Sequence, residues 1–382
     1  MKKFKFFGMM AVAAMAVSCS SDDVVQQVQE DNAIQFSTYL GNAAQSRGSE
    51  VRLDEIKAEG KGFGVFAYYT GTTAFADYTG GANFMNNQQV TWDEEGFAWT
   101  YSPIKYWPNN NNELVSFFAY APYDVNYVVS GEGKVTYEVP ADVTLQRDLL
   151  WSRSNTTDLK KQSLEDNVQF VFAHALAKIG LTVSCAADVE NAVAAGTIEA
   201  NTKVIVDEIV FSADNNVATA GPAPEPTTGA FYTKGVIDMN KTFEVGSGNI
   251  GLWDVTDAEK QMITLTAANF NPADLEYDAE DAAARATADD SYMMIIPQDF
   301  STGGLYVWIK YRVITEDAKL TDSKSEITNQ ICKQVAINFE QGKAYTLNLV
   351  LGLTEVKLDA TVDEWDEQDP VQIDLPANST NP

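Results

Sequence analysis

Alternation of apolar and polar residues is the dominant pattern in this 382-residue chain, and it recurs in many short segments. Apolar side chains occupy every second position from Leu305 to Val313 and again from Tyr345 to Leu353, which predicts half-buried strands. Leu114–Tyr120 is almost continuously apolar, as in a strand with both faces buried. Because these segments recur about every ten residues between turn signals, we predict an all-β fold built from sandwiches.

A polar stretch near the middle of the chain indicates two domains. Ser154–Asp166 has no clear period, and we interpret it as a linker. Val168–Val183 would open the second sandwich; its apolar positions change parity between Ala175 and Lys178, which predicts a bulge or a sharp bend. The expected parts are an N-terminal sandwich at 48–158, a C-terminal sandwich at 166–366 and a tail at 367–382.

Residues 1–18 are a secretory leader. Three lysines precede an apolar run, Phe6–Val17, that is too short for a permanent membrane span. Ala16-Val17-Ser18-Cys19 resembles the lipobox of bacterial lipoproteins, whose cysteine becomes the acylated N-terminus. Because several acyl chains together anchor a protein stably, the resemblance implies a lipoprotein that is acylated at Cys19 and held by its lipid in the outer membrane at the cell surface.

Residues 19–47 read as a lipid anchor, a polar spacer and a removable strand. Ala33–Leu40 alternates, and Ile34, Phe36 and Leu40 fall on the inward face. Arg47 follows in a run of small and polar residues, Gln45–Ser49, where proteases cut readily. Arg52 is an alternative cut point. The other interpretation is a permanent edge strand followed by an ordinary loop arginine.

The charge balance excludes a nucleic-acid partner. The formal net charge is −28, from 54 acidic and 26 basic residues, and a field of that sign repels nucleic acid and anionic lipid. The acidic residues are scattered through strand-like, aromatic-containing sequence, so they do not form a disordered acidic tail.

The sequence offers few groups for catalysis, metal or cofactor binding. His174 is the one histidine, on the apolar face of a predicted strand, and is expected to be a core residue. Cys185 and Cys332 are far apart, and the sequence leaves open whether they pair. Gly246–Gly251 spells G-x-G-x-x-G, but no helix pattern follows to hold a pyrophosphate. We therefore expect no cofactor, no metal site and no enzyme activity.

Acidic residues also cluster near the C-terminus. They do not follow EF-hand spacing, and we interpret them as a solvated face rather than a calcium site or a catalytic acid pair. The cluster consists of Asp359, Asp363, Glu364, Asp366, Glu367 and Asp369.

Taken together, these segments resemble the fimbrillin family of Bacteroidetes, the subunits of type V pili, in its Mfa-like branch. The matching segments span most of the mature chain and follow the family's order. They are the lipobox, Ile34–Phe36, Ser46-Arg47, Gly64–Ala67, Trp99–Pro103, Tyr106–Pro108, Phe117–Pro122, Asp148–Leu150, Phe172–Ile179, Ile296–Gln298, Gly342–Tyr345 and Trp365. The resemblance implies two tandem transthyretin-like β-sandwich domains.

The resemblance also implies a mechanism of assembly. Family members are exported as lipoproteins with an N-terminal strand in a slot of the first sandwich. An arginine-specific or trypsin-like protease removes that strand, and a strand of another pilus subunit fills the slot by β-augmentation. In this chain Arg47 would be the cut point. The tail offers a candidate donor strand with alternating Val371, Ile373 and Leu375.

A second class of function stays open at this stage. A surface lipoprotein could bind glycan or another ligand through aromatic platforms without polymerising. The candidate aromatic residues are Trp92, Trp99, Tyr101, Tyr106 and Trp107.

Overall fold

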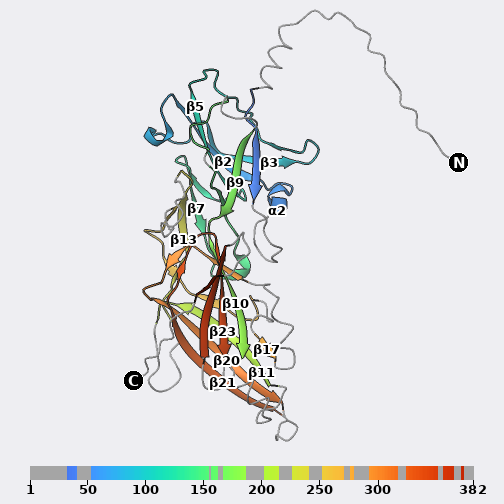
Figure 1. Cartoon of the computed structure of the whole chain (residues 1–382), viewed down its shortest axis with the longest axis vertical. Helices are drawn as coiled ribbons and strands as arrows, with labels where there is room; N and C mark the ends of the chain where they lie inside the picture. Colours follow the sequence, from blue (N-terminus) through green and yellow to red (C-terminus); the bar gives the residue numbers. More distant parts are fainter. Residues whose placement is uncertain are drawn as a thin grey trace, which may run out of the picture.

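The chain folds almost entirely into β-strands, as its alternating pattern predicts (Figure 1). The computed structural model describes residues 32–40, 53–154, 156–161, 167–185, 202–214, 226–240, 252–270, 276–278, 292–316, 324–351, 356–364 and 371–373. The described part is elongated, with one sheet at the N-terminal end, long strands at the C-terminal end and a smaller sheet between them. Its single α-helix is the one-turn α2 (Leu53–Lys57), and no helix among the described residues is long and apolar enough to cross a membrane.

Seven strands form the N-terminal sheet, in the order β1-β9-β8-β5-β2-β3-β4. Every neighbouring pair is antiparallel except β1 and β9, which run parallel. Gly62 precedes β2 at a φ of +95°, and a Cβ there would lie 1.9 Å from the carbonyl oxygen of Val90 on β3, so this close approach requires glycine. The strands are β1 (Phe36–Leu40), β2 (Phe63–Gly71), β3 (Met85–Asp93), β4 (Ala98–Thr100), β5 (Leu114–Ala121), β8 (Leu150–Ser152) and β9 (Val168–His174).

The two central strands of this sheet are buried on both faces. Phe117 of β5 faces one apolar cluster with β1 and β9, whereas Phe118 faces a second cluster with the middle sheet. Phe63 and Phe66 of β2 divide between the clusters in the same way. This double burial explains why the β5 segment reads as almost continuously apolar, and it confirms that prediction.

The predicted boundary between the sandwiches needs a correction. Val168–His174 was expected in the C-terminal sandwich, but it forms β9 of the N-terminal sheet, beside β1 and β8. Residues 156–161 of the expected linker also pack on this sheet, where Leu159 bridges Val115. The chain crosses to the C-terminal sheets between His174 and Ala177, where the parity changes. A short apolar strand carries no signal of which sheet it joins.

A four-stranded sheet, in the order β14-β13-β7-β6, lies beside the N-terminal sheet. It pairs β7 antiparallel with β13, although about 100 residues separate them in the chain. Its residues Tyr137, Ile237 and Trp253 pack with Tyr68 and Tyr120 of the N-terminal sheet. The strands are β6 (Val128–Ser130), β7 (Lys134–Glu138), β13 (Lys234–Asp238) and β14 (Trp253–Asp254).

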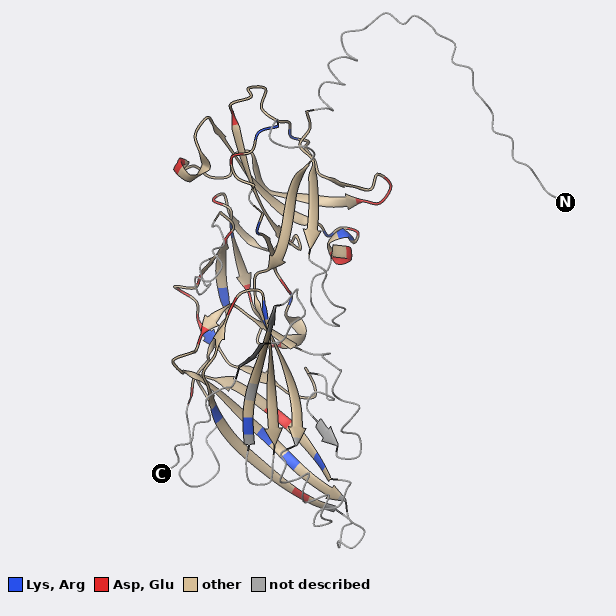
Figure 2. Ribbon diagram, viewed as in Figure 1, with Lys and Arg blue, Asp and Glu red and all other residues tan. Residues whose placement is uncertain are grey.

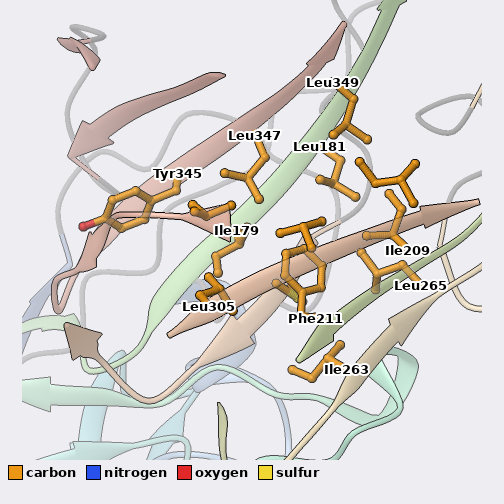
Figure 3. Packing of buried hydrophobic residues seen from close by; sticks show 14 of the residues in the cluster. Ile179, Leu181, Ile209, Phe211, Ile263, Leu265, Leu305, Tyr345, Leu347 and Leu349 are labelled. Atoms are coloured by element: carbon orange, nitrogen blue, oxygen red, sulfur yellow. The ribbon is translucent and has the colours of Figure 1, made fainter. Parts of the chain in front are cut away.

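Two five-stranded sheets form a sandwich at the C-terminal end. One has the order β18-β10-β23-β24-β25, and the other has β16-β11-β20-β21 with β17 also on β11. Figure 3 shows Ile179, Leu181 and Leu347 of the first sheet facing Ile209 and Phe211 of the second. The strands are β10 (Ala177–Cys185), β11 (Thr202–Ser212), β16 (Ile263–Leu265), β17 (Glu276–Asp278), β18 (Tyr292–Ile295), β20 (Leu305–Glu316), β21 (Lys324–Val335), β23 (Lys343–Leu351), β24 (Val356–Glu364) and β25 (Val371–Ile373).

The remaining elements are short. Two pairs of two-residue strands join loops, namely β12 with β15 and β19 with β22. The 3₁₀ helices are η1 (Phe75–Asp77) and η2 (Val143–Leu145). The short strands are β12 (Phe231–Tyr232), β15 (Lys260–Gln261), β19 (Gln298–Asp299) and β22 (Asn338–Phe339).

Charged residues are spread over loops and strands along the described part of the molecule (Figure 2). A tight network on the C-terminal sandwich centres on Arg312, whose guanidinium contacts Asp207 at 2.8 Å and Glu326 at 3.0 Å. Both partners are partly exposed, so this network contributes modestly to stability.

Candidate functional site

β1 is an edge strand that is held mainly by one neighbour. Its five residues pair in parallel with Val168–Phe172 of β9. The amide of Val168 also donates to the carbonyl of Gln35 at 2.9 Å, just before β1 begins. A five-residue strand at a sheet edge makes few backbone hydrogen bonds, so its side chains must supply much of its stability.

The segment before β1 is fixed on its opposite side. The amide of Ile34 donates to the carbonyl of Lys105 at 2.9 Å, and the amide of Trp107 donates to the carbonyl of Asn32 at 3.0 Å. Asn32 also donates through its side-chain amide to the carbonyl of Trp107 at 3.0 Å. The predicted strand Ala33–Leu40 therefore divides: residues 32–34 pair with 105–107, and Phe36–Leu40 pairs with β9.

Side chains of this segment alternate as the sequence predicts. Ile34, Phe36 and Leu40 are buried, whereas Gln35 is exposed. Thr38 shares the parity of the buried residues and is half-buried. The inward face of the segment thus carries three apolar side chains and one hydroxyl.

Phe36 is the anchor of the segment. Its ring stacks on Phe170 at a centroid distance of 5.4 Å and meets Phe117 edge-on at 5.9 Å. The rings of Tyr101 and Phe63 also pack against Phe36, at centroid distances of 5.4 and 6.2 Å. Complete burial of a phenylalanine contributes about 1.5–3 kcal/mol, and each favourable ring pair adds about 0.5–1.5 kcal/mol, so this one residue holds much of the edge strand.

Two aromatic side chains also bind the segment through hydrogen bonds. The hydroxyl of Tyr101 donates to the carbonyl of Ile34 at 2.9 Å, and the indole Nε1 of Trp99 donates to the hydroxyl of Thr38 at 3.0 Å. Burial raises the pKa of Tyr101 to about 12, and the nearby backbone of Lys105 opposes that rise in part. Tyr101 therefore stays a neutral hydrogen-bond donor at physiological pH.

A groove of about 490 Å³ lies alongside residues 33–38. Phe97 and Ile104 on its rim are exposed, at 77% and 45%, and Lys57 covers the face of Trp92 at 3.8 Å from the ring centroid. Among the described strands, β1 pairs with β9 alone. The lining residues are Ala33–Thr38, Lys57, Trp92, Phe97–Tyr101, Ile104 and Asn167.

Several predicted site residues lie outside the described part of the chain. They are Cys19, Arg47, Arg52 and Leu375. Leu40 ends β1, so the described chain stops seven positions before Arg47. The G-x-G-x-x-G run Gly246–Gly251 also lies outside the described residues.

The candidate donor strand is placed in part. Val371–Ile373 forms β25 and pairs antiparallel with Ala360–Val362 of β24. This puts β25 at the edge of a C-terminal sheet, on a three-residue ladder.

The structure describes the surroundings of His174 and Cys332. His174 is buried, as predicted, and its Nδ1 lies 2.7 Å from Oδ2 of the buried Asp148. Cys332 carries a free thiol, and burial raises the pKa of that thiol to about 11. Among the side chains that the structure describes, no group of three or more histidine, cysteine, aspartate or glutamate residues could hold a metal ion.

The five aromatic residues of the alternative ligand-binding hypothesis differ in exposure, and Trp92, Trp99 and Tyr101 line the groove. Trp99, Tyr101 and Trp107 are buried in the cluster around β1, as expected for large apolar side chains that pack in a core. Tyr106 is 40% exposed and Trp92 is half-buried. Three of the five candidate residues therefore have a packing role.

The sequence did not predict the hydrogen bonds that hold the N-terminal segment. Asn32, Trp99 and Tyr101 reach partners more than 60 positions away in the chain, and no spacing rule links residues so far apart. The aromatic segment Trp99–Pro108 stands out in the sequence, but its contacts with the N-terminal segment do not follow from it.

Comparison with known proteins gives the family. A family model described as fimbrillin-like matches residues 52–365, which is most of the chain. The chain belongs to the fimbrillin-like family. This confirms the resemblance seen in the sequence.

Two relatives of this fimbrillin-like chain were compared over nearly their full lengths. It is 23% identical over 377 residues to the fimbrium subunit Fim1C of Phocaeicola vulgatus, covering 92% of this chain and 93% of the relative. The crystal structure of a fimbrial protein from Bacteroides vulgatus superposes with a TM-score of 0.62 at 23% identity, covering 87% of this chain and 99% of that one. At this identity the structural likeness establishes the fold of the fimbrillin-like chain.

Proposed function

We propose that this chain is a structural, non-enzymatic subunit of a cell-surface fimbria and that it assembles by strand exchange. It is exported as a lipoprotein acylated at Cys19 and reaches the cell surface on the outer membrane. A protease with arginine specificity cuts after Arg47 and releases the N-terminal strand. A strand of another subunit then fills the slot beside β9.

One observation carries this proposal, namely the way in which the N-terminal segment is held. Phe36–Leu40 is a short edge strand with one neighbouring strand, and Phe36 sits among four aromatic rings. Its removal would expose an apolar groove together with the unpaired edge of β9. A sheet edge with an apolar groove is the surface that an extended strand fills by β-augmentation.

The family supports the coarser part of the proposal. Both compared relatives are fimbrial by name. The sandwich at the C-terminal end and the N-terminal sheet with its middle sheet are consistent with two tandem transthyretin-like domains. The chain first passes from the N-terminal sheet to the C-terminal sandwich near His174–Ala177, and β13 and β14 later return to join β7 in the middle sheet. The tail with Val371, Ile373 and Leu375 is the candidate donor for the slot of another subunit.

Limited digestion with an arginine-specific protease tests the mechanism. We expect cleavage after Arg47 in the mature chain, loss of residues 19–47 from the folded remainder, and multimers that resist dissociation in unboiled denaturing gels once a donor strand is available. N-terminal sequencing identifies the cut. Two matched variants, Arg47→Gln and Arg52→Gln, separate the two candidate cut points.

Each result has a distinct meaning. Protection in Arg47→Gln alone supports cleavage at Arg47, whereas protection in Arg52→Gln alone moves the cut to Arg52. If the folded chain resists cleavage at both arginines, or if residues 32–40 stay bound after cleavage in the presence of excess donor strand, the strand is permanent and the proposal fails.

A further inference from the structure

The slot contains a polar position that an apolar strand cannot satisfy. Trp99 is 8% exposed, and its indole Nε1 donates to the hydroxyl of Thr38 at 3.0 Å. The hydroxyl belongs to the inward face of the N-terminal segment, two residues after the anchor Phe36. The slot therefore presents an apolar subsite followed by a hydrogen-bond donor.

The position of this donor is fixed by packing. The Trp99 ring meets Phe63 edge-on at 4.9 Å and Trp92 at 5.2 Å, so rings on two neighbouring strands hold it. Among the described residues, the hydroxyl of Thr38 is the acceptor for this N–H. An occupant that offers no side-chain acceptor at this position loses that hydrogen bond, which typically contributes about 0.5–1.5 kcal/mol.

We propose that Trp99 makes the slot selective for a strand that carries serine or threonine two residues after its central apolar anchor. The required pattern is apolar-x-apolar-x-Ser/Thr, read in the direction of β1. This inference rests on the proposed function, because it concerns the strand that replaces residues 32–40. It identifies Trp99 as the residue that determines specificity.

The chain's own tail does not match this pattern. The chain's own tail alternates as Val371, Ile373 and Leu375, followed by Ala377 in the same parity. If Val371, Ile373 or Leu375 takes the place of Phe36, the residue at the place of Thr38 is Ile373, Leu375 or Ala377, respectively. All three lack a hydrogen-bond acceptor. The occupant is therefore a strand from a different subunit with a hydroxyl at this position, in preference to the tail of a second copy.

Exchange with synthetic peptides tests the proposal. The full mature chain is cleaved after Arg47 and incubated with a peptide of residues 32–41, with the same peptide carrying Thr38→Ser or Thr38→Val, and with a peptide of residues 369–378. Uptake is followed by mass spectrometry under native conditions. We expect the threonine and serine peptides to bind about tenfold more tightly than the valine peptide, and the tail peptide to bind more weakly than the threonine peptide.

The variant Trp99→Phe identifies the source of the preference. Phenylalanine keeps an aromatic ring but has no N–H, so the ratio of threonine to valine binding should fall to about one. Each ratio is measured on one protein, so any loss of stability in the variant cancels. If Trp99→Phe does not fold, the relative affinities of the serine and valine peptides for the unchanged chain still test whether the slot prefers a hydroxyl.

Strand exchange and selectivity through Trp99 can fail independently in this experiment. If the cleaved chain takes up none of the peptides, strand exchange itself is wrong. If it takes up the threonine, valine and tail peptides equally well, exchange stands and the selectivity through Trp99 is overturned. A preference for threonine that persists in Trp99→Phe would also overturn it.

Discussion

The hydroxyl of Tyr101 donates a 2.9 Å hydrogen bond to the main-chain carbonyl of Ile34, across 67 positions of sequence. The same hydroxyl accepts from the amide of Lys105 at 3.3 Å. One buried phenol thereby fastens the start of the N-terminal segment to the chain that follows β4. Tyr101 donates to a backbone carbonyl, so any strand in the slot can accept this hydrogen bond. Trp99 instead donates to a side-chain hydroxyl, which only some strands carry.

Loss of this phenol should loosen the N-terminal segment. Tyr101→Phe keeps the ring beside Phe36 and removes the hydrogen bond, which contributes about 1 kcal/mol. We expect hydrogen exchange of residues 34–40 to become about fivefold faster, with little change in the C-terminal sandwich. Tyr106→Phe is the control, since Tyr106 is 40% exposed. Equal exchange in the two variants would show that the Tyr101 hydroxyl does not hold the segment.

Phe36 should be the residue whose truncation costs most within the segment. Phe36→Ala leaves a cavity among four rings, and such truncations cost about 3–5 kcal/mol. Phe36→Leu retains most of the apolar volume and should cost less. Urea unfolding with tryptophan fluorescence measures both, because Trp99 lies in the same cluster. Tyr39→Ala, on the exposed side of β1, is the control and should change stability by about 0.5 kcal/mol or less. A cost for Phe36→Ala no larger than that would contradict the anchor role.

The contact between Asp148 and His174 should stabilise the place where the chain changes sheet. Both side chains are buried and 2.7 Å apart, and the backbone of His174 pairs with Leu150 of β8. Asp148→Ala removes the acceptor at Nδ1 and should cost about 1–3 kcal/mol in the free energy of unfolding. Asp148→Asn keeps an acceptor and should cost less. Glu94→Ala, on the exposed hairpin, is the surface control. If Asp148→Ala unfolds at the same urea concentration as that control, the Asp148–His174 contact does not contribute to folding stability.

The sequence predicted the class of the fold from residues that repeat with a period of two. Leu305–Val313 and Tyr345–Leu351 lie in long strands, β20 and β23, whose alternate positions fill the C-terminal core. It failed at β9, where Phe170 and Phe172 alternate correctly but face the N-terminal cluster. Periodicity reports which face of a strand is buried, and it does not report which sheet the strand joins.

Sequence patterns predicted the buried residues of the N-terminal segment. They did not predict which side chains of the N-terminal sheet contact that segment. The alternation of Ile34 and Phe36 follows from local sequence and is present in the structure. The donors from Trp99 and Tyr101 depend on a turn of the chain between β4 and β5 that brings residues 99–107 beside residues 32–38. Such a juxtaposition is a property of the sheet order, so no local pattern carries it.

Cys332 should react slowly with thiol reagents in the folded chain. Burial raises its pKa to about 11, so little thiolate is present at pH 8, and the thiolate is the reactive form. A chain that begins at Ser20 and carries Cys185→Ser has Cys332 as its one thiol. At pH 8 we expect its alkylation by iodoacetamide to be about 100-fold slower than in guanidinium, and to accelerate as the pH rises towards 11. Equal rates in the folded and unfolded chain would show that the thiol is not protected.

The C-terminal tail should be needed for assembly more than for folding. β25 adds three residues to the edge of β24, and so short a backbone ladder contributes little to the stability of a sandwich. Deletion of Asp369–Pro382 should therefore leave the unfolding midpoint of the monomer nearly unchanged and reduce the incorporation of the chain into fimbriae. Deletion of Pro376–Pro382 alone, which keeps Val371–Leu375, is the matched control and should assemble normally. Normal assembly of the longer deletion would remove the tail as the donor strand, whereas a large loss of stability would make β25 a structural strand of its own sandwich.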